Sequence, residues 1–247
     1  MPPWIPPSDR LALTLFGELD LRGPAPGDIA HVIAQPKLVA LLAYLAVAGP
    51  GHFVRRDRLV GLLWMELDQI RARAALRRAL HAIRDALGAI VLARGDEELA
   101  IADGMLWCDV PAFDRAMSSG YHAAALELYR DELLPGFHIV GASAFGHWLD
   151  GERAERKAHA AVAAWSLAER FEAGGELTNA GGWARRAVLL AGEDERTLRR
   201  AIALLDRVGD RAAAVRLYVD FARRLHEELE MEPSPETRAM IARWRDS

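Results

Sequence analysis

The chain has 247 residues, of which 51% are hydrophobic and 27% are charged, and its formal net charge is −4 at pH 7. This balance is typical of globular proteins and excludes a disordered chain, and the length favours two domains. The single cysteine, Cys108, cannot form an intramolecular disulfide, and no paired Cys/His spacing suggests zinc. We therefore expect a protein of the reducing cytoplasm that uses no metal or other cofactor.

No segment predicts secretion or a membrane span. Residues 1–7 lack the basic and apolar regions of a signal peptide, and their prolines favour a short extended arm. The longest apolar run, residues 38–48, is shorter than the roughly 20 residues that a transmembrane helix needs. We expect no membrane partner.

The first half of the chain has the element order of a winged helix-turn-helix domain. Apolar and polar residues alternate over 11–21, which predicts a strand or hairpin with Gly17 at a bulge or turn. Three helices follow, of which the first begins at Pro36 and the third is capped by Asp68. A β-hairpin with a Gly95-Asp96 turn comes last. The expected helices cover 36–48, 56–64 and 68–88, the hairpin covers 90–102, and the domain covers 1–107.

The second half, 108–247, is predicted to be entirely helical. Similar segments begin at Gly120, Gly175 and Gly209, and the last two are 34 residues apart, which is the tetratricopeptide period. The Gly181-Gly182 step is unfavourable inside a helix by about 1 kcal/mol per glycine and predicts a kink or loose packing. The expected fold class is mostly α: an α+β winged helix-turn-helix followed by an all-α tetratricopeptide-like repeat domain. The expected helices are 109–118, 120–130, 143–173, 176–191, 193–208, 210–229 and 234–245.

Positive charge is concentrated at the predicted third helix. Residues 55–84 carry eight arginines and three acids, although residues 1–107 as a whole are near neutral. Four apolar residues from Leu76 to Leu87 form a stripe that must pack inward. At about 100° per residue, the cations fall beside or opposite this stripe. With small alanines between them, they suit a DNA major groove, in which arginine bonds guanine edges or phosphates. The predicted DNA contacts on this helix are Arg71, Arg73, Arg77, Arg78, His81 and Arg84.

Three of these positions have a second interpretation. Arg73 and Arg84 lie next to the apolar stripe, so their side chains would equally cover the core or pair with acids. An exposed His81 that contacts nothing is the plainer interpretation of that residue. The helix alone therefore does not establish DNA binding, and its place in a winged-helix outline is what favours it.

Further predicted DNA contacts lie on either side of this helix. Arg55 and Arg56 begin the second helix, where a cation opposes the helix macrodipole unless an anion such as a phosphate binds there. A solvated turn is the alternative. Arg94, close to the hairpin tip, would enter the minor groove or touch a phosphate, whereas the acidic residues 96–98 would repel DNA.

Several segments in combination resemble the Streptomyces antibiotic regulatory protein family. In the first half these are residues 35–46 (QPKLVALLAYLA), 54–64 (VRRDRLVGLLW) and 72–88 (ARAALRRALHAIRDALG). The second half resembles the bacterial transcriptional activator domain of that family in residues 108–113, 128–137, 148–153, 209–218 and 232–237. The resemblance extends from about residue 11 to residue 243.

The resemblance implies an OmpR-type winged helix fused to a tetratricopeptide-type activator domain. It also implies binding to direct repeats at promoters, often as a side-by-side homodimer, and contact with RNA polymerase. Carried onto this sequence, the recognition helix is 68–87, the wing is 90–102 and the polymerase-facing loop is 64–68. Some members carry an ATPase domain, but no Walker motif occurs in this chain.

The chain departs from the family pattern at three places. Arg55 stands where a serine is usual, so we expect the second helix to lack its cap, and Met65 stands where a proline is common. The wing tip is acidic. These departures leave the wing contact and the detailed polymerase contact open.

The predicted function is a sequence-specific DNA-binding transcription regulator whose partners are double-stranded DNA and RNA polymerase. The alternative is an adaptor or sensor whose helical groove binds a protein or a small effector, and the near-neutral first half favours it. The histidines are scattered without a nucleophile motif, so we expect no enzyme. No residue indicates the chemistry of an effector.

Overall fold

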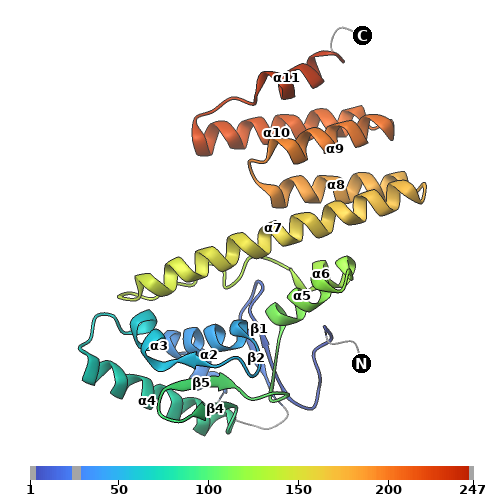
Figure 1. The fold of residues 1–247 in the computed structure, drawn as a ribbon. Coiled ribbons are helices and arrows are strands. Elements are labelled where there is room, and N and C mark those ends of the chain that lie inside the picture. Colours follow the sequence, from blue (N-terminus) through green and yellow to red (C-terminus); the bar gives the residue numbers. More distant parts are fainter. Residues whose placement is uncertain (1–3, 24–28, 245–247) are drawn as a thin grey trace. The chain divides into compact units, whose positions relative to one another are not determined.

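The computed structural model describes residues 4–23 and 29–244 (Figure 1). The chain divides into two compact units, residues 1–155 and 156–247. Residues 1–3, 24–28 and 245–247 lie outside the described residues, and with them the beginning of the predicted arm and the end of the last predicted helix. None of the described helices is long and apolar enough to cross a membrane.

Two three-stranded sheets form the β part of the first unit. In the order β2-β1-β6, strand β1 pairs antiparallel with β2 and parallel with β6, and in the order β3-β5-β4 all pairs are antiparallel. The predicted strand region and hairpin are both present, whereas β3 and β6 were not predicted. The strands are β1 (Leu11–Thr14), β2 (Asp20–Arg22), β3 (Val54–Arg55), β4 (Val91–Arg94), β5 (Glu98–Ile101) and β6 (Leu106–Cys108).

The helices of the first unit complete the predicted winged helix-turn-helix. Helix α2 spans the predicted residues, and all residues from Leu38 to Ala46 are buried, as its continuous apolar run requires. The short helix α1 was not predicted. The helices are α1 (Ile29–Ile33), α2 (Pro36–Ala48), α3 (Arg56–Leu63), α4 (Gln69–Leu87), α5 (Asp109–Ser118) and α6 (His122–Leu128).

The predicted domain boundary and the compact units differ. Residues after 107 pack within the first unit: Leu133 forms a bridge with Phe16, and α5 packs against β1 and β6. The predicted domains, 1–107 and 108–247, therefore stay a prediction about how the sequence is organised.

A buried carboxylate joins β1 to α5. Asp109, the first residue of α5, is 2% exposed. It accepts hydrogen bonds from the backbone N–H of Leu15, at 2.9 and 3.0 Å, and of Phe16, at 2.9 Å. Burial raises the pKa of Asp109 to about 6, and the hydrogen bonds to the ionised form oppose this rise. The carboxylate therefore holds the start of α5 against the backbone that follows β1.

Ionisation of Asp109 predicts a pH-dependent stability. The pKa of Asp109 in the folded protein lies above the ordinary value of 3.8. The contribution of Asp109 to the free energy of unfolding is therefore complete below about pH 4, where the group is protonated, and is lost as the pH rises through 6. The difference in free energy of unfolding between the parent and Asp109→Asn should fall by up to about 3 kcal/mol between pH 4 and pH 7. Urea denaturation across this range measures it. Asp103→Asn, at an exposed aspartate, is the control, and parallel curves for the parent and Asp109→Asn would contradict the prediction.

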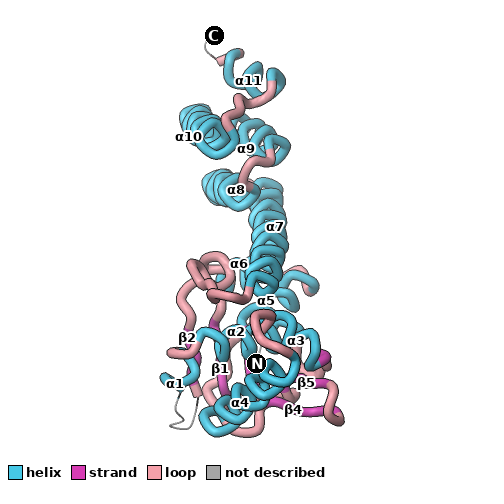
Figure 2. The backbone as a smooth tube through the Cα atoms, turned by 90° about the vertical axis from the view of Figure 1, so that its left-hand side faces the viewer, coloured by secondary structure: helices cyan, strands magenta, loops and turns pink. Residues whose placement is uncertain are grey.

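The described part of the second unit contains helices alone (Figure 2). Helix α9 packs against α8, α10 and α11, around buried Leu198, Ile202 and Phe221. Asp194, Asp210 and Ser234 cap their helices by accepting backbone hydrogen bonds. The all-helix prediction is confirmed for the described part of this unit, whereas earlier in the predicted range Cys108 belongs to β6 and Leu133 forms a β-bridge. The elements are α7 (Ser143–Ala173), whose last residues belong to this unit, α8 (Leu177–Ala191), α9 (Glu195–Arg207), α10 (Arg211–Leu229) and α11 (Pro235–Ala242).

The loose packing predicted at the glycine pair is wrong at Gly181. Helix α8 runs through both glycines, and Gly181 is buried. A Cβ added to Gly181 would lie 3.2 Å from Cδ2 of Leu205 on α9. The absence of a side chain therefore allows the two helices to approach closely, which offsets the low helix propensity of glycine.

Candidate nucleic-acid interface

Helix α4 has well-defined ends and one buried face. The Asp68 carboxylate accepts a hydrogen bond from the Arg71 N–H at 2.9 Å, and Gly88 ends the helix with a φ of 81°. The predicted stripe is confirmed in part, since Leu76 and Ile83 are buried while the other two leucines are half-buried. Alanines complete the inward face, whose buried residues are Ala72, Ala75, Leu76, Ala79, Ile83 and Ala86.

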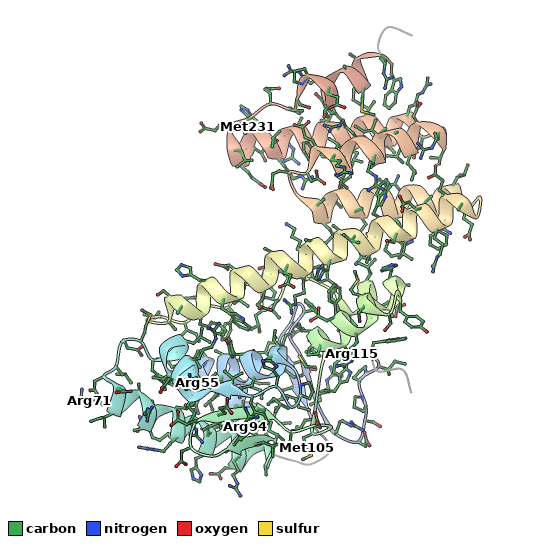
Figure 3. The ribbon with its side chains drawn as sticks, viewed as in Figure 1. Arg55, Arg71, Arg94, Met105, Arg115 and Met231 are labelled. Carbon is green, nitrogen blue, oxygen red and sulfur yellow. The ribbon has the colours of Figure 1, made fainter. Side chains whose placement is uncertain are left out.

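Three arginines of α4 have exposed side chains that are available to a ligand. Arg77, Arg78 and Arg84 are exposed, and none of them forms an ion pair within the part of the chain that the structure describes. Arg71 is also exposed, with 78% of its side chain accessible (Figure 3), and its ion pair with Asp68 at 3.3 Å lies on the surface. Surface pairs of this kind are weak, so an incoming phosphate would compete with it.

Arg73 is tied to α3 instead. Its Nη2 lies 2.8 Å from Oδ1 of Asp57, and this hydrogen bond and charge raise the pKa of Arg73. The pair connects the first turn of α3 with α4. Of the two interpretations that the sequence leaves open for Arg73, pairing with an acid is the one that the structure has.

Removal of Asp57 should therefore release a cation toward DNA. We expect Asp57→Asn to strengthen binding to any duplex and to steepen the dependence of log K on log salt by about one phosphate contact. Fluorescence anisotropy at a series of salt concentrations measures the slope. Adding Arg73→Ala to this variant should remove the gain. An unchanged slope in Asp57→Asn would show that Arg73 does not face the nucleic acid.

The unpredicted helix α1 packs against α4 and forms a groove with it. The groove, of about 450 Å³, is lined by His31, Arg78, His81 and Asp85 among others. Nε2 of His81 lies 3.2 Å from Oδ2 of Asp85, and both side chains are exposed. The sequence did not indicate that His31 lines this groove, because α1 has only five residues and no hydrophobic periodicity that would predict a helix.

Helix α3 begins without a side-chain cap, as its arginines predicted. Arg55 is the N-cap residue, and its side chain makes no capping hydrogen bond. The N–H of Arg56 donates to the carbonyl of Glu97 at 2.8 Å, which ties α3 to the wing. Arg55 is exposed and Arg56 is half-buried. Their contact with a phosphate stays a prediction.

The wing arginine is held by its own hairpin. Nε of Arg94 lies 2.5 Å from Oε2 of Glu98, and its guanidinium carbon lies 4.3 Å from the centre of the Phe53 ring. The acidic residues 96 and 97 at the tip are exposed. To reach DNA, Arg94 must therefore break its contacts with Glu98 and Phe53, and its contact with DNA stays a prediction.

The loop between α3 and α4, residues 64–68, carries a buried tryptophan next to an exposed methionine. Trp64 is buried, and the Lys37 ammonium lies 5.6 Å from the centre of its ring and 2.5 Å from Oε1 of Glu66. Met65 in this loop is 55% exposed, and Ile70, in the first turn of α4, is 81% exposed. The described residues contain no group of three or more metal-ligating side chains.

Comparisons with known proteins agree with this architecture. The family model of the bacterial transcriptional activator domain matches residues 111–245. A search of curated proteins found no match. Among solved structures, Mycobacterium tuberculosis EmbR in complex with a low affinity phosphopeptide is 21% identical with a TM-score of 0.63, and the alignment covers 96% of this chain and 66% of EmbR. At that identity the likeness concerns the fold. The chain therefore belongs to the bacterial transcriptional activator domain family.

Proposed function

We propose that this regulator binds double-stranded DNA sequence-specifically through α4. The observation that carries the proposal is the set of three exposed arginines without ion pairs, Arg77, Arg78 and Arg84, on the third main helix of a winged helix-turn-helix. An open guanidinium binds guanine edges or phosphates bidentately without first breaking an internal pair.

The shape of α4 supports the same proposal. Ala74 and Ala82 lie half-buried between the arginines, so the helix backbone can approach base edges closely. The other face is fixed to the core by buried residues, which keeps the exposed face rigid. A rigid helix with short side chains between long cations fits the major groove.

We further propose cytoplasmic action as an activator at promoter direct repeats. Side-by-side dimers would bind the repeats, and residues 64–68 would contact RNA polymerase. The exposed Met65 beside the Lys37–Glu66 ion pair offers polymerase an apolar contact next to charge. Binding in repeats fits a single helix that reads only a few base pairs per copy.

A second function is favoured by the electrostatics. The net charge is −4, and the wing tip is acidic. Both features weaken the attraction to phosphates. An adaptor that binds a protein or small effector through the helical repeats would have these features without a need for duplex DNA.

Selection from random duplexes separates the two functions. The purified chain is incubated with the pool at two salt concentrations, and bound duplexes are amplified over several rounds. Enrichment of a repeated sequence whose affinity falls steeply with salt supports the regulator and gives the spacing of its repeats. A pool without enrichment at either salt concentration refutes DNA recognition and favours the adaptor.

A further inference from the structure

A pocket with apolar walls lies in the first unit beside β6 and the start of α5. Its volume is about 470 Å³, within the range of about 300–1,000 Å³ that small-molecule sites occupy. One wall is the N-terminal arm, whose Trp4 packs on Tyr121 with ring centres 4.6 Å apart. The walls include the apolar residues Ile5, Pro7, Ile101, Leu106, Trp107 and Pro111.

Two arginines give the pocket a positive charge. Arg10 and Arg115 both line it, together with a single carboxylate, Asp9. The Asp9–Arg10 pair, at 3.5 Å, neutralises one guanidinium in part. Arg115, on α5 (Figure 3), forms no ion pair among the described residues. The described residues that line the pocket therefore carry one uncompensated positive charge, that of Arg115.

We propose that this pocket binds a small amphipathic monoanion, such as a carboxylate or sulfonate on an aromatic body. The aromatic part would pack against the proline-rich arm and Trp107, and the anion would pair with Arg115. Among the described residues that line the pocket, no second cation lacks an ion pair, so a single negative charge matches it better than a dianion. The residues that line this pocket lie outside α4, so ligand binding here is independent of DNA binding.

The position of the pocket gives such a ligand two elements to contact. Ile101 is the last residue of β5, in the sheet of the wing, and Pro111 and Arg115 belong to α5. A bound ligand would therefore stabilise the join between the wing hairpin and the start of the activator-domain sequence.

The test uses 8-anilinonaphthalene-1-sulfonate, an aromatic sulfonate whose fluorescence rises in apolar sites, with the full chain and no DNA. We expect one saturable site. Arg115→Met should weaken it about tenfold, since a hydrogen bond to a charged group is lost. Arg10→Met should have a smaller effect because Asp9 already pairs with that residue. Circular dichroism and thermal melting establish that each variant is folded.

Two controls make the result specific. Arg238→Met, at an exposed arginine of α11, should bind the sulfonate like the parent. The uncharged dye N-phenyl-1-naphthylamine should bind the parent and Arg115→Met equally. Absence of a saturable site, or unchanged sulfonate affinity in a folded Arg115→Met, would overturn the proposal. Equal weakening of both dyes would also overturn it, because the arginine would then shape the cavity and not recognise the anion.

Discussion

Replacing Arg78 with alanine is expected to weaken binding to the selected duplex about 5- to 150-fold, the range for one bidentate base contact. Arg78 is exposed, forms no ion pair among the described residues, and projects from the middle of α4. A lost base contact also relaxes the preference at one base pair, whereas a lost phosphate contact weakens every duplex alike. Affinities for the selected duplex and its single-base variants, measured by anisotropy, separate these cases.

Arg77→Ala is the matched comparison on the neighbouring position. Arg77 lies on the flank of the helix, so we expect uniform weakening and a salt slope lower by about one. Arg238→Ala, in α11, should leave both quantities unchanged. If the Arg77 and Arg78 variants both bind like the parent, α4 does not present this face to DNA.

Phe16→Ala is expected to lower the free energy of unfolding by about 3–5 kcal/mol, as for other buried phenylalanines. Phe16 is fully buried, and its ring centre lies 5.4 Å from that of Phe113 and 5.0 Å from that of Tyr129. These three rings join the end of β1 to α5 and α6. Truncation removes the contacts of the Phe16 ring with Phe113 and Tyr129 and leaves a cavity that the surrounding side chains fill only in part.

Urea denaturation measures this loss, and Phe137→Ala provides the control. Phe137 also packs edge-on against a phenylalanine, Phe145, but is only half-buried. Its truncation should therefore cost clearly less than that of Phe16. Equal losses in the two variants would mean that the cluster around Phe16 is not a centre of stability in the first unit.

The long helices were predictable because their signals are local. Pro36 begins α2 and Gly49 follows its end, as the sequence indicated, and Asp68 and Gly88 bound α4 in the same way. Each signal depends on residues a few positions apart, so no tertiary contact is needed to recognise it. The exposed positions of Arg77 and Arg78 follow from the same periodicity.

The features that were missed depend on contacts between distant residues. Strand β6 has three residues and exists through its parallel pairing with β1, about 95 positions earlier in the chain. Arg73 meets Asp57, and Arg94 meets Phe53, only after α3, α4 and the wing have packed together. The sequence therefore indicated which cations lie near the proposed DNA-binding face but could not show which of them already have partners within the protein.

A DNA-cleaving reagent attached to α4 would show whether this helix lies against DNA. Burial raises the pKa of the Cys108 thiol well above its ordinary value, so a thiol-directed iron chelate will react with an introduced exposed cysteine instead. Gln69→Cys places the chelate at the start of α4, and Ser119→Cys, at the end of α5, is the control. We expect cleavage confined to each repeat of the selected duplex for the first variant, and background cleavage for the second. Background cleavage from Gln69→Cys, on a duplex that the labelled chain still binds, would show that α4 does not lie in the DNA groove.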